Sequence, residues 1–252
     1  MDTKLKNKVA IVTGASKGIG AGIAKALGLS GATVVINYAS GKNDADQVVS
    51  EIQSKGGKAL AVQADMSKSA DVRRLFDTAK TEFGSIDILV NNAGLAIFEM
   101  IGDLTEEAFH KQFNLNVLGY MLAAQQALKH MDKKGGSIIN ISSILSTDPY
   151  LASSVYSATK GAVDTITLAL ARELGPNKIR VNSILPGHTN TPATAGNFDG
   201  DLGDKLIAGT PLGRFGEPED IAPLAVFLAS DDAHWITGES IRASGGVRGV
   251  GY

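Results

Sequence analysis

The chain has 252 residues, of which 44 % are hydrophobic and 20 % are charged, and its formal net charge is −2. This composition predicts a well-buried core, and the near-neutral charge gives no electrostatic reason to expect nucleic acid or an anionic membrane as a partner. The absence of cysteine excludes disulfides, thiolate nucleophiles and cysteine-ligated metals, and the four histidines show no ligand spacing, so no metal site is expected. The charged N-terminus runs directly into a strand, and no apolar run is long enough to span a membrane. We therefore expect a cytoplasmic protein without a signal peptide.

Short β-branched runs alternate with longer amphipathic segments along the whole chain. Strands are predicted at 9–13, 33–37, 59–62, 86–90, 137–142, 179–184 and 240–243. Helices are predicted at 18–29, near 45–55, near 70–83, from about 105 to 131, at 153–174, and from about 218 onward. Continuous apolar strands separated by helices indicate a parallel sheet that is buried on both faces. Right-handed crossovers then make it a doubly wound, Rossmann-type α/β sheet of about seven strands. No linker or repeat divides the chain, so we predict one domain over 1–252.

The least regular stretch is 186–215, which is rich in Gly, Thr, Asn and Asp. In a doubly wound sheet it would lie above the carboxyl ends of the strands, where ligands bind. We expect a mobile lid over the substrate, and an ordinary surface loop is the alternative.

A glycine-rich turn, Thr-Gly-Ala-Ser-Lys-Gly-Ile-Gly over 13–20, joins the first strand to the first helix. Gly14 permits a tight turn, Gly18 lets the backbone approach a pyrophosphate, and Gly20 allows close packing of helix on strand. The free amides and positive end of the helix favour an anion there. The turn as a whole therefore predicts a phosphate-binding site that also includes Ser16, Lys17 and Ile19.

Tyr156 and Lys160 lie four residues apart on a predicted helix, with Ser143 upstream at the end of an apolar run. Positions i and i+4 share a helix face, so the ammonium can lie close to the phenol. A nearby positive charge favours the phenolate and lowers the tyrosine pKa from about 10 toward neutrality. The set predicts a site with an acid, a cation and a hydroxyl donor, and a plain helix surface is the alternative.

The spacing Gly-x-x-x-Gly-x-Gly, the motif Asn-Asn-Ala-Gly at 91–94 and the Ser143, Tyr156 and Lys160 set together resemble the short-chain dehydrogenase/reductase family. The resemblance covers nearly the whole chain, with the motifs in the family's order. It is nearest to bacterial NADPH-dependent ketoreductases, including 3-oxoacyl-carrier-protein reductases. It implies reversible hydride transfer between a nicotinamide cofactor and an alcohol or carbonyl.

The resemblance implies a role for each catalytic residue. Tyr156 would be the general acid/base, and Lys160 would lower its pKa and bind the nicotinamide ribose. Ser143 would donate to the substrate oxygen as in an oxyanion hole, with Ser142 as the competitor for that role. Asn116 would hold a water that links Lys160 to solvent, and a buried capping role is the alternative for it.

The resemblance also assigns cofactor-binding residues beyond the glycine turn. Asp65 would accept a hydrogen bond from the adenine, although it could instead cap the following helix. The further residues expected at the cofactor are Met66, Asn92, Ala93, Gly94, Tyr156, Lys160, Pro186, Gly187, Thr189 and Thr191.

The end of the second strand decides between the two nicotinamide cofactors, because an acid there binds the ribose hydroxyl of NAD and repels the extra phosphate of NADP. This chain has Asn37, Tyr38, Ala39 and Ser40, with no acid before Asp44. Basic and hydroxyl groups that can reach the same corner are Lys17, Ser40 and Lys42. NADP(H) is therefore favoured over NAD(H), and a solvated Lys17 is the alternative.

The substrate is not legible in the sequence beyond a small or medium carbonyl compound. We expect a ketone or β-keto ester reductase, with a 3-oxoacyl-carrier-protein reductase or a glucose-type dehydrogenase as alternatives and a non-catalytic cofactor sensor as a remote one. A carrier protein predicts a basic patch at the pocket mouth, for which Lys133, Lys134 and Lys178 are candidates. Family members are commonly tetramers, so we expect a homotetramer in which 245–252 docks on a neighbour.

Overall fold

The computed structural model describes residues 4–196 and 200–248, so the expected docking of the C-terminal segment falls partly outside the described residues. Seven strands form one sheet in the order β3-β2-β1-β4-β5-β6-β7, and each neighbouring pair is parallel. This confirms the predicted doubly wound sheet. The strands are β1 (Val9–Val12), β2 (Thr33–Tyr38), β3 (Lys58–Gln63), β4 (Ile88–Asn91), β5 (Gly136–Ile141), β6 (Ile179–Pro186) and β7 (Ser240–Ala243).

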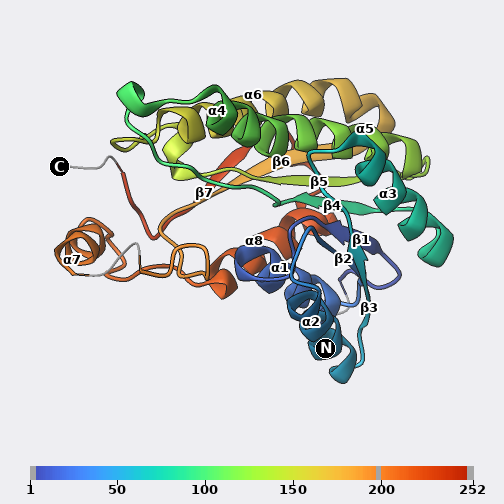
Figure 1. Cartoon of the computed structure of the whole chain (residues 1–252). Coiled ribbons are helices and arrows are strands. Elements are labelled where there is room, and N and C mark those ends of the chain that lie inside the picture. The colour runs from blue at the N-terminus through green and yellow to red at the C-terminus, as the bar shows by residue number, and fades with distance from the viewer. Residues whose placement is uncertain (1–3, 197–199, 249–252) are drawn as a thin grey trace.

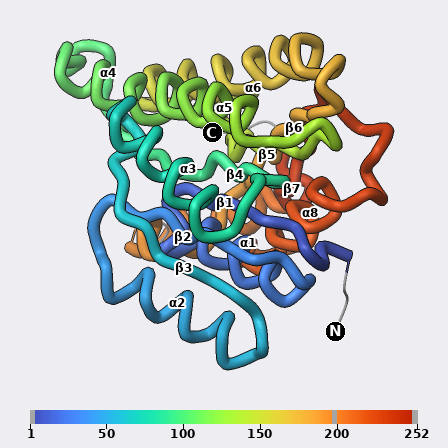
Figure 2. The backbone as a smooth tube through the Cα atoms, turned by 90° about the vertical axis from the view of Figure 1, so that its right-hand side faces the viewer, coloured from blue at the N-terminus to red at the C-terminus, as the bar shows by residue number. Residues whose placement is uncertain are grey.

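Helices cover both faces of the sheet (Figures 1 and 2). The first face carries α1 (Gly18–Leu29), α2 (Lys42–Ser54) and α8 (Pro218–Ala229). The opposite face carries α3 (Ser69–Phe83), α5 (Gly119–His130) and α6 (Ser154–Leu174). Along the described residues, no helix is both long and apolar enough to cross a membrane.

The two helical layers explain why the strands have no polar face. In β1, Ala10 and Val12 pack into the core beneath α1 and α8, whereas Val9 and Ile11 pack into the core beneath α3 and α5. All four residues are buried. Since successive side chains of a strand point to opposite faces, a strand covered on both sides must be apolar at every position.

Two predictions about helices were wrong in detail. The helix expected from about 105 to 131 is divided into α4 (Glu106–Phe113), a π-helical turn at Asn114–Leu118, and α5. The irregular stretch after β6 contains a short helix, α7 (Asp201–Ala208), which lies away from the sheet (Figure 1). Hydrophobic periodicity does not detect the single extra residue of a π-turn, and the two leucines of α7 were too few to stand out in a polar segment.

The strand order positions the functional site. Strand β1 lies between β2 and β4, and the chain leaves its carboxyl end toward β2 on one side, whereas β4 continues toward β5 on the other. The two connections diverge and leave a crevice above the carboxyl ends of β1 and β4.

Candidate active site

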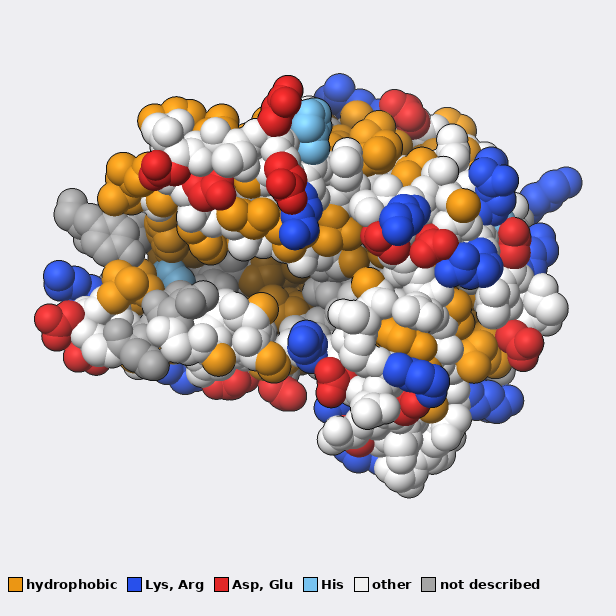
Figure 3. All heavy atoms as spheres, in the orientation of Figure 1, with side chains coloured by type: hydrophobic (Ala, Val, Ile, Leu, Met, Phe, Trp, Pro, Cys, Tyr) orange, Lys and Arg blue, Asp and Glu red, His pale blue; other side chains and the backbone are white. Residues whose placement is uncertain are grey.

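A cavity of about 940 Å³ opens above the carboxyl ends of the strands, and hydrophobic side chains gather within the hollow visible in Figure 3. The residues predicted for the cofactor or the chemistry line this cavity, except Asn116 and Lys42, and Lys42 instead pairs with Asp46 on α2. The cavity also takes in both leucines of α7, Leu202 and Leu206, so the stretch predicted as a lid forms part of the wall. No cluster of potential metal ligands occurs within 4–196 and 200–248.

The glycine turn is held by the Asn-Asn-Ala-Gly motif. Asn92 Nδ2 donates to the carbonyls of Thr13 and Gly14 at 2.9 and 3.0 Å, and the Thr13 hydroxyl accepts from the amides of Asn92 and Ala93. Gly14 and Gly18 have φ values of +60° and +58°. A Cβ on Gly20 would lie 2.4 Å from Asn92 Nδ2. Close approach of the two motifs thus requires glycine at this point.

The first turn of α1 is prepared for an anion. Lys17 stands at the N-cap without a side-chain cap, and no acidic residue occupies the first turn. The amides of this turn keep their donor capacity, and the positive end of the helix dipole is not compensated by a carboxylate. Both features fit the pyrophosphate of a dinucleotide, as does the size of the cavity.

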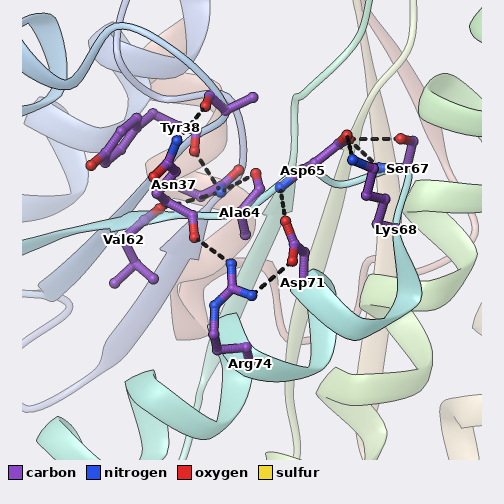
Figure 4. Close-up of polar contacts among 11 residues, drawn as sticks. Asn37, Tyr38, Val62, Ala64, Asp65, Ser67, Lys68, Asp71 and Arg74 are labelled. Atoms are coloured by element: carbon purple, nitrogen blue, oxygen red, sulfur yellow. Dashed lines mark hydrogen bonds and ion pairs between the residues drawn. The ribbon is translucent and has the colours of Figure 1, made fainter.

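Asn37 was predicted to contact the cofactor, but its side chain forms hydrogen bonds with backbone groups (Figure 4). Its Oδ1 accepts from Gly14 N at 3.1 Å, and its Nδ2 donates to Ala64 O at 3.0 Å. The residue is 1 % exposed. Asn37 therefore ties the glycine turn to the ends of β2 and β3, and it lines the cavity without offering it a free amide.

Asp65 forms its polar contacts in the turn before α3, whose N-cap is Lys68 and not Asp65, and its expected contact with the adenine stays a prediction. Its Oδ1 accepts from Ser67 N and Ser67 Oγ at 3.0 and 2.7 Å, which stabilises the turn into α3 (Figure 4). Its Oδ2 lies 3.5 Å from Lys68 Nζ. The same residue lines the cavity.

The corner expected to select the cofactor contains no competing acid. Lys17 and Ser40 are both exposed and line the cavity together with Ala39. Among the described residues of the cavity wall, Asp65 carries the single carboxylate. A 2′-phosphate at Lys17 and Ser40 would therefore face a cation and a hydroxyl.

The three residues of the catalytic set meet in the cavity. Tyr156 and Lys160 come from the first turns of α6, and Ser143 caps the short helical turn after β5. Ser143 Oγ accepts from Leu145 N at 3.2 Å, which leaves its own hydrogen for another acceptor. Burial raises the pKa of Tyr156 to about 12, and the hydrogen bond with Ser143 acts in the opposite direction by favouring the phenolate.

Lys160 is buried and turned toward the backbone. Its Nζ donates to Ile141 O at 2.8 Å and lies 5.7 Å from the centre of the Tyr156 ring. Burial lowers the pKa of Lys160 to about 8, and the charge of Asp164 partly opposes this. The sequence predicts that the ammonium lowers the pKa of Tyr156. In the protein without cofactor this pKa is raised instead, because burial is the largest influence on the pKa of both Tyr156 and Lys160.

Asn116 lies behind the cavity wall in the π-helical turn and has no exposed surface. Its side chain accepts from Leu95 N at 2.9 Å and donates to Leu95 O at 2.8 Å and Thr159 Oγ1 at 3.1 Å. The buried structural role kept as the alternative is thus present, and the predicted water link stays a prediction.

Two aromatic residues at the site were missed by the sequence analysis. Tyr120 on α5 donates its hydroxyl to Ile141 O at 3.1 Å, and its ring centre lies 5.4 Å from Lys160 Nζ. Phe98 packs against Tyr156 with ring centres 5.8 Å apart. Tyr120 lies four residues after Asn116, and in a regular helix this spacing would place both on one face and could have revealed Tyr120. The π-helical turn at Asn114–Leu118 breaks that regularity.

Comparisons with known proteins give consistent matches. A family model described as enoyl-(acyl carrier protein) reductase matches residues 14–248. An uncharacterised oxidoreductase of Methylorubrum extorquens is 54 % identical over 98 % of this chain and 100 % of that protein. A short-chain dehydrogenase/reductase of Serratia marcescens has a TM-score of 0.91 at 37 % identity, over 97 % of this chain and 99 % of that one. The angucycline C-6 ketoreductase LanV with bound NADP has a TM-score of 0.91 at 39 % identity, over 97 % and 96 %.

Proposed function

Because this chain belongs to the short-chain dehydrogenase/reductase family of oxidoreductases, we propose that it is an NADPH-dependent carbonyl reductase that converts a ketone to an alcohol, reversibly. The observation that carries the proposal is the convergence of Ser143, Tyr156 and Lys160 on the cavity that the glycine turn also lines. One cavity thus combines an anion cradle with a hydroxyl donor, an acid and a cation. A single sheet running from residue 9 to residue 243 supports one catalytic domain over 1–252.

The chain's own groups handle the proton. Ser143 donates a hydrogen bond to the substrate carbonyl oxygen, and Tyr156 gives that oxygen its phenolic proton. Lys160 stabilises the phenolate that remains, because its positive charge lies close to the Tyr156 ring and its ammonium has two donors besides the one bound to Ile141 O. Asn116 helps to return a proton through water. When bound, the nicotinamide supplies the hydride that the carbonyl carbon receives.

The residues that hold the cofactor are those of the glycine turn, the Asn-Asn-Ala-Gly motif and the segment after β6. NADP is preferred over NAD because Lys17 and Ser40 meet the 2′-phosphate. The NADP in the LanV structure supports this preference. The test is calorimetric titration of NADPH and NADH into the wild type and into Lys17→Gln/Ser40→Ala. We expect the variant to lose at least tenfold in NADPH affinity and little in NADH affinity, and equal losses for both would remove the assignment.

Simple ketones and β-keto esters are the proposed substrates. The candidate basic patch for a carrier protein does not support that alternative, because Lys133 and Lys134 precede β5 and Lys178 precedes β6. These lysines lie at the amino edge of a parallel sheet, whereas the cavity opens at the carboxyl edge. A sugar dehydrogenase is disfavoured by the many apolar side chains around the Tyr156 end of the cavity.

Assembly and cellular location complete the proposal. We expect a cytoplasmic homotetramer in which 186–215 acts as a lid. Apolar or small side chains that a tetramer could cover are exposed on the outer helices and the turn after α8, among them Ala158, Leu168, Phe227 and Trp235. Sedimentation of a monomer would contradict the assembly.

The decisive experiment measures NADPH oxidation with a panel of ketones, β-keto esters and acyl thioesters, using Tyr156→Phe as the matched control. We expect turnover by the wild type, and a loss of at least 10³-fold in the variant with NADPH affinity unchanged within about twofold. NADPH binding without turnover of any compound would favour the alternative that the protein is a non-catalytic cofactor sensor.

A further inference from the structure

Aromatic rings line the half of the cavity that surrounds Tyr156. Phe98 meets the Tyr156 ring at an interplanar angle of 58°. Tyr150 and His188 stack with an interplanar angle of 13° and ring centres 5.6 Å apart. Behind this wall, and not lining the cavity itself, the ring of Phe215 packs 5.9 Å from that of His188. These rings come from four separate segments of the chain, so their gathering is a property of the fold.

Apolar surface also remains exposed within the cavity. Phe98, Leu151 and Leu202 line it and are 51 %, 78 % and 44 % exposed. Hydrophobic side chains are also the main feature of the hollow in Figure 3. A ligand that covers an apolar wall gains binding free energy in proportion to the area removed from water, and a flat ring gains further from stacking. The wall therefore favours a planar, rigid substrate over a polar or highly flexible one.

A polar pair interrupts this apolar wall. Tyr150 Oη and His188 Nε2 form a hydrogen bond, and both residues line the cavity. Burial lowers the pKa of His188, so its imidazole is neutral at neutral pH. The phenol oxygen has two lone pairs and one hydrogen, so it can bind His188 and a substrate hydroxyl together.

The pair lies within reach of the reaction site. Tyr150 and Tyr156 pack against the same small apolar cluster, which is built on Ile144, Leu145, Leu185 and Val247. A ring system whose carbonyl sits at Tyr156 would thus extend along the same wall toward Tyr150.

We propose, resting on the carbonyl reduction proposed above, that the substrate is a planar aromatic ketone with a phenolic hydroxyl away from the reacting carbonyl. The ring packs against Phe98, and the hydroxyl binds the Tyr150–His188 pair. Tyr150 and His188 are then the specificity-determining residues.

The test compares 1-tetralone, its 5-, 6- and 7-hydroxy isomers, and the acyclic ethyl acetoacetate, each with NADPH. We expect kcat/KM of the best hydroxytetralone to exceed that of 1-tetralone by about tenfold, the worth of one hydrogen bond. Tyr150→Phe should reduce this ratio to about 1, and His188→Gln should reduce it as well. Phe98→Leu should lower kcat/KM for 1-tetralone and for the best hydroxytetralone several-fold relative to kcat/KM for ethyl acetoacetate. The matched Phe113→Leu, which removes a ring stacked on Phe109 outside the cavity wall, should leave every ratio unchanged.

The outcomes separate this inference from the function on which it rests. If ethyl acetoacetate is reduced faster than every tetralone, the aromatic class is wrong and carbonyl reduction stands. If Tyr150→Phe and His188→Gln both keep the preference for the hydroxytetralone, the pair does not select it. If no ketone is reduced, the proposed function itself fails. NADPH affinity of each variant establishes that its site is folded.

Discussion

Replacing Lys160 with methionine should stabilise the cofactor-free protein at pH 7, although it removes a catalytic group. Lys160 is 3 % exposed, and its ammonium donates to Ile141 O. Methionine fills a similar volume without a charge, so the variant avoids keeping a cation out of water. The carbonyl of Ile141 keeps the hydroxyl of Tyr120 as a donor.

The magnitude follows from the pKa of Lys160, which burial lowers from 10.5 to about 8. At 1.36 kcal/mol for each pKa unit, the buried charge costs roughly 3 kcal/mol at neutral pH. Loss of the hydrogen bond to Ile141 O returns about 1 kcal/mol, which leaves a net gain of about 2 kcal/mol for the variant.

The sign of the pH dependence is set by the lowered pKa. Between pH 8 and pH 10.5 the unfolded chain binds more protons at Lys160 than the folded one, so the wild type gains stability as the pH rises through this window. By pH 10 the cost of the buried lysine falls to roughly 1 kcal/mol. The advantage of Lys160→Met should therefore shrink to near zero.

Urea unfolding followed by far-UV circular dichroism at pH 7, 8.5 and 10 measures this, at one protein concentration so that assembly does not shift the midpoint. The exposed Lys80 on α3 supplies the control, since Lys80→Met should change stability little and equally at each pH. A Lys160→Met protein that is less stable at pH 7, or whose advantage is the same at pH 7 and pH 10, would refute the reasoning.

Three further substitutions test other contacts. Tyr120→Phe keeps the ring beside Lys160 but removes the hydroxyl that shares the carbonyl of Ile141 with the Lys160 ammonium. The ammonium should then bind that carbonyl more firmly and the cofactor less well, so NADPH affinity should fall several-fold. An unchanged affinity and pH profile would reduce Tyr120 to a packing role. Asn37→Leu leaves a buried amide and a buried carbonyl unpaired and should cost about 2 to 3 kcal/mol in unfolding experiments, whereas a loss below about 0.5 kcal/mol would mean that the turn relaxes. Arg242→Met breaks a mostly buried ion pair of 2.5 Å with Asp148, which lies in the segment after Ser143, and should cost about 2 kcal/mol, part of which Asp148→Asn in the same chain should restore.

The sequence alone was sufficient for the parts of this protein that depend on local pattern. Continuous apolar runs at strand length predict β1 to β7 because a parallel sheet is covered on both faces. The Gly14–Gly20 turn was recognisable because glycine spacing encodes backbone geometry directly. Tyr156 and Lys160 were found because helix periodicity relates residues four apart.

Tertiary structure alone decided how the side chains in the cavity are used. Asn37 was expected at the cofactor, but the backbone of the glycine turn and of the residue after β3 takes up its amide. Lys160 lies near the Tyr156 ring, as expected, but its hydrogen bond goes to the carbonyl of Ile141. Phe98 and Tyr120 gave no local signal and reach the site from distant segments. The common reason is that a buried polar group bonds whichever partner the packing places within reach, and that partner is set by contacts far apart in the chain.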